Sequence, residues 1–182
     1  MDYRIQQLEQ ITLAFQEKFS ALSLEELNWK SKDDTWSIAQ NIEHIIIINQ
    51  SYFPILARIR SGIYRQPFMA KSKLLSSFFG NAILKSVRPD RKKKSQTFAI
   101  WEPSQQPSEN ILQEFGLHQA ILKEKIKESQ DLIQQGIIIV SPANKNIPYS
   151  LDKAFDILIS HELRHFNQAK GVLVQMELKK KH

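Results

Sequence analysis

The chain has 182 residues, a net charge of +6 and no cysteine. The length is typical of one domain, and we expect residues 1–182 to form a single one. The absence of cysteine excludes disulfides, thiolate metal ligands and a cysteine nucleophile, and 5 glycines and 7 prolines argue against collagen-like and turn-rich all-β chains.

The first half of the chain contains two stretches in which apolar residues alternate at spacings of three and four, the pattern of an amphipathic helix. The first stretch covers residues 5–22 and the second covers residues 38–59. Ser37 and Gln40 form an S-x-x-Q capping box, which predicts that the second helix begins at Ser37. Gly62 is expected to end it.

The second half contains two further stretches of this kind. The third covers residues 112–133, with Ser108 as its expected N-cap and Gly136 as its expected end. The fourth follows Ser150, and its apolar side carries a defined set of residues: Ala154, Leu158, His161, His165, Gln168 and Val172. Four long amphipathic helices in a glycine-poor chain predict an all-α fold, a four-helix bundle.

The second and third helices are separated by a long insert, residues 62–107. Apolar pairs within residues 74–84 predict a short extra helix there, and residues 95–109 are expected to cross the bundle as extended chain. The connection before the fourth helix contains residues 137–140, which form either a short strand or a cover for the core.

The insert carries most of the positive charge. Residues 65–94 contain nine basic residues and one acidic residue, Asp90, so their net charge is +8 and the remainder of the chain is at −2. Three interpretations stay open: a solvated loop, an electrostatic contact with nucleic acid or an anionic membrane, and a funnel for an anionic substrate. Since no recognition module for DNA or RNA is present, a nucleic-acid partner is not expected.

The N-terminal segment gives no sign of a targeting signal. It is polar from its first residues, and the longest apolar run, residues 45–48, is far short of the roughly 20 residues that span a bilayer. We therefore expect a cytoplasmic protein without a membrane span.

His161 and His165 are the most informative polar residues. They are four residues apart, so they share one face of the fourth helix, on the side where a core normally has Leu or Ile. Neutral imidazoles are good ligands for zinc, nickel and related ions. A metal site is one interpretation of the pair, and a hydrogen-bonded histidine pair in the core is the other.

The same segment matches H-E-x-x-H, a pattern of zinc peptidases in which the glutamate is the general base. Here that glutamate is Glu162. Gln168 stands where the extended form of the motif has glycine, and only 17 residues follow His165. The peptidase interpretation is therefore not favoured.

A third ligand would complete a metal site. The candidates are His44, His118, His182 and the carboxylates. His118 lies beside the apolar side of its helix and is expected to be a structural residue at the edge of the core. His44 flanks the apolar side of the second helix, and periodicity alone makes it only a fair ligand.

Two segments resemble the signatures of the DinB/YfiT-like superfamily. Residues 36–45, WSIAQNIEHI, resemble its tryptophan–serine motif with a histidine, and residues 160–168, SHELRHFNQ, resemble its H-x-x-x-H motif followed by glutamine. The resemblance implies a four-helix bundle of up-down-down-up arrangement, and many members of the family are homodimers. It also implies a divalent metal bound by His44, His161 and His165.

Some members of that family are thiol-dependent transferases or isomerases that use a low-molecular-weight thiol such as bacillithiol or mycothiol. Three histidine ligands would leave an open position on a zinc or nickel ion, as in catalytic sites. A thiolate would have to come from a cosubstrate, because the chain has no cysteine. Glu162 is a candidate base or supporting group, and Gln168 a candidate for orienting the cofactor or a water molecule.

The sequence therefore predicts a metal-dependent transferase or hydrolase that acts on a small molecule. Two alternatives stay open. One is a non-enzymatic bundle that binds a metal or a small ligand, with a stress-related role. The other is an interaction module that acts through the basic insert.

Overall fold

A computed structural model describes residues 2–66, 68, 72–91 and 96–181. Four long helices account for most of it: α1 (Tyr3–Phe19), α3 (Ile38–Arg60), α5 (Ile111–Glu128) and α7 (Leu151–Lys180). The shorter elements are α2 (Leu24–Asn28), α4 (Lys73–Ser86), the 3₁₀ turn η2 (Ala99–Trp101), α6 (Gln130–Gln134), β1 (Ile138–Ser141) and β2 (Asn144–Ser150). The fold is mostly helical, as expected, with a small antiparallel sheet that an all-α description lacks.

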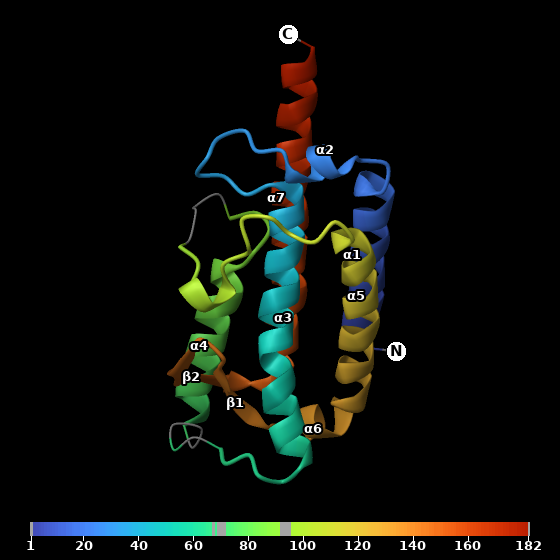
Figure 1. Ribbon diagram of the computed structural model, residues 1–182. Helices are drawn as coiled ribbons and strands as arrows, with labels where there is room; N and C mark the ends of the chain where they lie inside the picture. The colour runs from blue at the N-terminus through green and yellow to red at the C-terminus, as the bar shows by residue number, and fades with distance from the viewer. Residues whose placement is uncertain (1, 67, 69–71, 92–95, 182) are drawn as a thin grey trace.

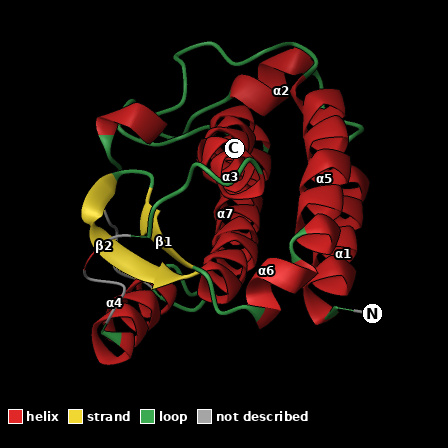
Figure 2. Cartoon of the chain, turned by 90° about the horizontal axis from the view of Figure 1, so that it is seen from below, coloured by secondary structure: helices red, strands yellow, loops and turns green. Residues whose placement is uncertain are grey.

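The elements lie in three groups side by side (Figures 1 and 2). The central pair is α3 and α7, which pack against each other along their length. Helices α1 and α5 pack together on one side of this pair, and α4 with the β1–β2 hairpin lies on the other. The C-terminal part of α7 extends past the ends of its neighbours (Figure 1).

The helix boundaries follow local chemistry. The predicted capping box at α3 is confirmed: Ser37 Oγ accepts from the Gln40 backbone N–H, and the Gln40 side chain accepts from the Ser37 backbone N–H. Ser150 caps α7 by accepting from the Lys153 backbone N–H. Just past α3, Gly62 has φ of 71°, a left-handed conformation that glycine adopts without steric cost.

The third predicted helix differs from the structure at both ends. Its N-cap is Asn110 rather than Ser108, whose hydroxyl instead donates to Glu114. The helix is also interrupted at Ser129, where the hydroxyl donates to the Lys125 carbonyl. A serine that bonds back to its own helix competes with the regular backbone ladder, and here α5 ends and the short α6 follows.

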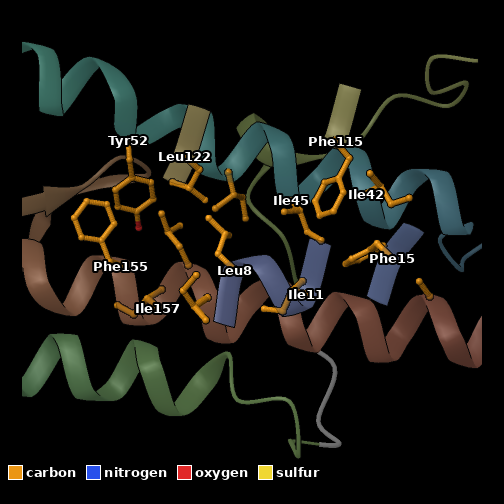
Figure 3. Close-up of a cluster of buried hydrophobic side chains, with 14 of the residues drawn as sticks. Leu8, Ile11, Phe15, Ile42, Ile45, Tyr52, Phe115, Leu122, Phe155 and Ile157 are labelled. Atoms are coloured by element: carbon orange, nitrogen blue, oxygen red, sulfur yellow. The ribbon is translucent and has the colours of Figure 1, made fainter. Parts of the chain in front are cut away.

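The core fills the space between the long helices (Figure 3). Leu8, Ile45 and Leu122 come from α1, α3 and α5 and face one another there. Elsewhere in the core, the ring centroids of Phe15 on α1 and Phe115 on α5 are 4.7 Å apart. Interlocking apolar side chains of this kind hold the long helices in fixed relative positions, which the functional site requires.

The predicted helix of the insert is present as α4. It packs on β2 and on the N-terminal part of α7 through Ser76 and Gly80, which are both buried. Four lysines of the insert, residues 71 and 92–94, lie outside the described residues. Among the residues that are described, no helix combines the length and the apolar character needed to cross a membrane.

Candidate metal centre

The packing of α3 on α7 brings three histidines together. His44 lies near the N-terminal end of α3, and His161 and His165 lie one turn apart near the middle of α7. All three side chains are buried. Each offers a ring nitrogen to a group whose atoms all lie within 4.8 Å of one another, so the three predicted ligands do converge.

The spacing within this group suits a shared cation. The Nε2 atoms of His161 and His165 lie 3.0 Å apart. Ligand nitrogens lie about 2.0–2.1 Å from a zinc ion, which places two of them roughly 3 Å from each other. Two facing imidazole nitrogens can share one proton or one metal ion, and the presence of a third nitrogen nearby, from His44, favours the metal ion.

The ring of His165 is held by a hydrogen-bond relay. Its Nδ1–H donates to Asn41 Oδ1 at 2.9 Å, and Asn41 Nδ2 donates to the Ser37 carbonyl at 2.8 Å. The second bond fixes the amide so that its oxygen faces the histidine, which assigns the proton to Nδ1. His165 Nε2 then carries its lone pair toward His161 Nε2, and a lone pair at Nε2 is the arrangement that ligating histidines use.

His44 is oriented in the same way by the insert. Its Nδ1–H donates to the Trp101 carbonyl at 2.7 Å, so Nε2 is again the nitrogen with a lone pair. His161 differs, because its Nδ1 is buried and has no hydrogen-bond partner within the described part of the chain. A buried polar atom without a partner is costly, and binding at Nε2 would offset part of that cost.

Trp36 forms one wall of the site. Its ring centroid lies 4.6 Å from that of His44 and 5.9 Å from that of His165. A cavity of about 220 Å³ adjoins this wall, and Trp36 and Gln40 both line it. The remaining lining residues are mainly charged or polar: Lys30, Asp33, Asp34, Thr35, Glu102, Pro103 and Gln105.

Burial keeps the three imidazoles neutral. It lowers the pKa of His44 to about 4 and lowers the pKa values of His161 and His165 well below their usual value. The positive charge of Arg164 lowers the pKa values of His161 and His165 further. Neutral imidazole is the form that binds metal ions, so the site is ready for a ligand at neutral pH.

Arg164 also ties the insert to α7 beside the histidines. Its guanidinium donates to the backbone carbonyls of Arg88 at 3.2 Å and Arg91 at 2.9 Å. One turn earlier, Ser160 Oγ donates to the Val87 carbonyl at 3.5 Å. With the bond from His44 to Trp101, these contacts place both ends of the segment from Val87 to Trp101 next to the candidate metal centre.

Glu162 lies elsewhere. Its side chain is 0% exposed and accepts from Asn49 Nδ2 and Gln119 Nε2, each at 2.7 Å. Burial raises its pKa to about 7. Its carboxylate is not part of the histidine group in the described chain, and its partners lie on α3 and α5. A role for Glu162 as a base stays a prediction.

Two other expectations need comment. Gln168 is exposed on α7, and the neighbouring Ala169 is buried in its place, so its role toward a cofactor also stays a prediction. His118, expected at the edge of the core, is 3% exposed, and its Nε2 accepts from Asn49 Nδ2 at 3.1 Å. It lies on α5, outside the histidine group of the described chain, and it is buried within the core rather than at its edge, so its structural role stays a prediction.

Two residues that support the histidines were not predicted as site residues, although the sequence motifs contain them. Trp36 and Asn41 both lie inside the tryptophan–serine motif, so their positions within it were a usable signal. Trp101 contributes only a backbone carbonyl, which any residue provides, and no side-chain pattern could have identified it.

Comparison with known proteins adds one result. The family model of the DinB superfamily matches residues 7–169, which include the three histidines and the insert. No curated protein and no solved structure gives a significant match.

Proposed function

The chain belongs to the DinB superfamily, and we propose that it is a divalent-metal-dependent enzyme, a thiol-dependent transferase or a hydrolase, that acts on a small molecule. One observation carries the proposal: His44, His161 and His165 offer convergent, neutral nitrogens from two helices that are packed against each other. Three protein ligands are the number typical of catalytic zinc sites. Zinc or nickel suits this all-imidazole donor set.

A divalent ion held by the three histidines would supply a Lewis acid that polarises a carbonyl group or favours the ionised form of a bound water or thiol. The residues of this chain do the positioning. Asn41 Oδ1 and the Trp101 carbonyl accept hydrogen bonds from the Nδ1–H groups of His165 and His44 and so fix these two imidazoles. Arg164 adds positive potential beside His161 and His165, which favours an anionic ligand such as a thiolate.

The cavity next to Trp36 is where we place a small-molecule substrate; Trp36 contacts the histidines, which do not themselves line the cavity. Its volume of about 220 Å³ is below the usual range for drug-sized ligands, and Asp33, Asp34 and Glu102 give part of its lining a negative charge. Since the chain has no cysteine, a thiol for a transfer reaction would come from a low-molecular-weight cosubstrate.

Three further features belong to the same proposal because they come from the family resemblance. These are the up-down-down-up order of α1, α3, α5 and α7, assembly as a homodimer, and a cytoplasmic location. The pairing of α1 with α5 and of α3 with α7 supports the first of them.

The second candidate function is a non-enzymatic bundle that binds a metal or a small ligand. It is favoured by the burial of all three histidines, which are only 2–8% exposed. A catalytic ion needs access for substrate, whereas a bound structural ion does not.

The test combines metal analysis with activity screening. The purified protein is stripped with a chelator, reloaded with zinc or nickel, and assayed for thiol conjugation to electrophiles and for ester hydrolysis. We expect about one ion per chain and activity that is lost in His44→Ala. One ion per chain with no turnover in either screen would favour the second candidate function. A protein that binds no metal would refute the metal-dependent form of both candidates.

A further inference from the structure

Helix α4 presents a fixed face to the outside of the molecule. Its inner face carries Gly80, where an added Cβ would lie 2.8 Å from Lys153 Cγ and 3.2 Å from Tyr149 Cβ. Contacts this close to β2 and α7 define how the helix is rotated. Figure 2 shows α4 at the edge of the molecule, on the side away from α1 and α5.

The outer face is apolar where a surface helix is normally polar. Leu74 is 86% exposed and Phe78 is 67% exposed, and the two lie one turn apart on the same face. Phe78 contacts Phe79 through a ring edge, with 5.7 Å between the centroids, and most of its surface still faces solvent. Large apolar side chains that are exposed together form an apolar patch, and such a patch becomes a candidate interaction surface when its surroundings suit a partner.

The charged residues of α4 itself have one sign. The sequence of α4 contains no acidic residue, and exposed lysines, Lys73 and Lys85, lie at its two ends. The only acidic residue within residues 65–94 is Asp90, which forms an ion pair with Arg88 at 2.9 Å. The surface is therefore apolar and cationic together, within a segment whose net charge is +8.

We propose that α4 docks the protein on an anionic lipid surface, with Leu74 and Phe78 inserted between the headgroups. A helix with apolar residues on one face and lysines beside them lies in the interface of a bilayer and prefers anionic lipids. Nucleic acid would use the cations but not the two apolar side chains. The docking is independent of the metal centre and goes beyond the proposed function.

The test is flotation of the purified chain with lipid vesicles. We expect it to float with phosphatidylcholine vesicles that contain phosphatidylglycerol and to remain free with phosphatidylcholine alone. Leu74→Ser/Phe78→Ser should weaken binding about tenfold or more, since each buried methylene contributes to partitioning. Lys73→Glu/Lys85→Glu should weaken it as well, because each cation near the surface contributes roughly fivefold.

A matched control is available on α5. Leu117 and Ile121 are also one turn apart and exposed, but they lie outside the insert. Leu117→Ser/Ile121→Ser should bind vesicles as the unchanged protein does. Circular dichroism and metal content of every variant establish that the fold is kept.

Several outcomes would overturn the proposal. They are no binding to the anionic vesicles, equal binding by Leu74→Ser/Phe78→Ser, and loss of binding in the α5 control. If the unchanged chain is a dimer by light scattering and Leu74→Ser/Phe78→Ser is a monomer, while neither binds vesicles, a second copy covers this face instead. None of these results depends on metal binding, so the proposed function is tested separately.

Discussion

His161 and His165 face each other through their Nε2 atoms, 3.0 Å apart, in the buried space between α3 and α7. Two neutral imidazoles in that position can share only one proton, and burial and Arg164 keep both rings neutral, the form that binds metal ions. A divalent ion satisfies both nitrogens at once and uses the third one, from His44, as well.

We therefore expect one divalent ion per chain, lost on replacement of any of the three histidines by alanine. Metal content after stripping and reloading, measured by plasma mass spectrometry, checks this. His118→Ala is the matched control, since His118 is an equally buried histidine outside the group. Equal metal loss in His118→Ala, or full retention in His165→Ala, would contradict the assignment.

Asn41 should control metal affinity without touching the metal. Its Oδ1 accepts a hydrogen bond from His165 Nδ1–H, and loss of such a supporting hydrogen bond typically weakens metal binding about 10–100-fold. Asn41→Ala is expected to show this change in a competition titration with a chromogenic chelator. Asn49→Ala is the control. Asn49 is a buried asparagine of the same helix, but its side chain bonds to Glu162 and His118, so its loss should leave the metal affinity within about twofold.

Removal of the metal should destabilise the fold. An ion that binds only the folded state stabilises it by about 2.7 kcal/mol at a free concentration one hundred times its dissociation constant. The midpoint of thermal unfolding should therefore fall when a chelator is added. The same addition should have no effect on His44→Ala, and a fall of similar size in that variant would mean that the chelator acts elsewhere.

Much of this arrangement follows from spacing along the chain. The alternation of three and four residues predicts the long helices, and the capping box at Ser37 sets the start of α3 because its chemistry is entirely local. The four-residue separation of His161 and His165 places them on one face of any helix. Periodicity does not identify His44 as the third ligand, because its distance from α7 depends on tertiary packing. The resemblance to the family motif was needed for that prediction.

Other features could not be predicted from periodicity alone. A strict alternation of three and four drifts relative to the 3.6-residue turn, so the buried side of α7 moves from Gln168 to Ala169. The helix break at Ser129 coincides with a side-chain hydrogen bond to the Lys125 carbonyl, which periodicity does not reveal. Helix α2 was missed although Ser23 and Glu26 form a capping box, because five residues are too few to show a period.

Acid should destabilise the protein partly through His118. Burial lowers its pKa to about 4 in the folded chain, against 6.5 when exposed. Between pH 6.5 and pH 4, His118 is protonated in the unfolded chain but neutral in the folded chain. The free energy of unfolding therefore falls across this range, by roughly 3 kcal/mol at most.

Urea unfolding of the metal-free protein at several pH values tests this, with His118→Gln as the comparison. The difference in free energy of unfolding between the two proteins should shrink as the pH falls through that window. Glu162, whose raised pKa acts with the opposite sign, is present in both proteins and largely cancels. A difference that is constant from pH 7 to pH 4 would show that His118 is not kept neutral by burial.

Two glycine-to-alanine changes should have opposite effects on stability. Gly171 lies within α7 and has no atom within 4 Å of an added Cβ, so Gly171→Ala should stabilise the chain by the helix propensity of alanine, about 0.8–1 kcal/mol. Gly80 also lies within a helix, but its added Cβ would meet Lys153 Cγ at 2.8 Å and Tyr149 Cβ at 3.2 Å. Moving α4 or Lys153 to make room costs about 1–3 kcal/mol, so Gly80→Ala should leave stability unchanged or lower it.

Urea denaturation of both variants at one metal concentration measures the two effects. Because the substitution and the helical setting are the same, the difference between them isolates the contact of α4 with β2 and α7. If Gly80→Ala stabilised the protein as much as Gly171→Ala, α4 would not be held this closely against its neighbours. Its outer face would then have no fixed direction, and the lipid-facing arrangement of Leu74 and Phe78 would lose its structural basis.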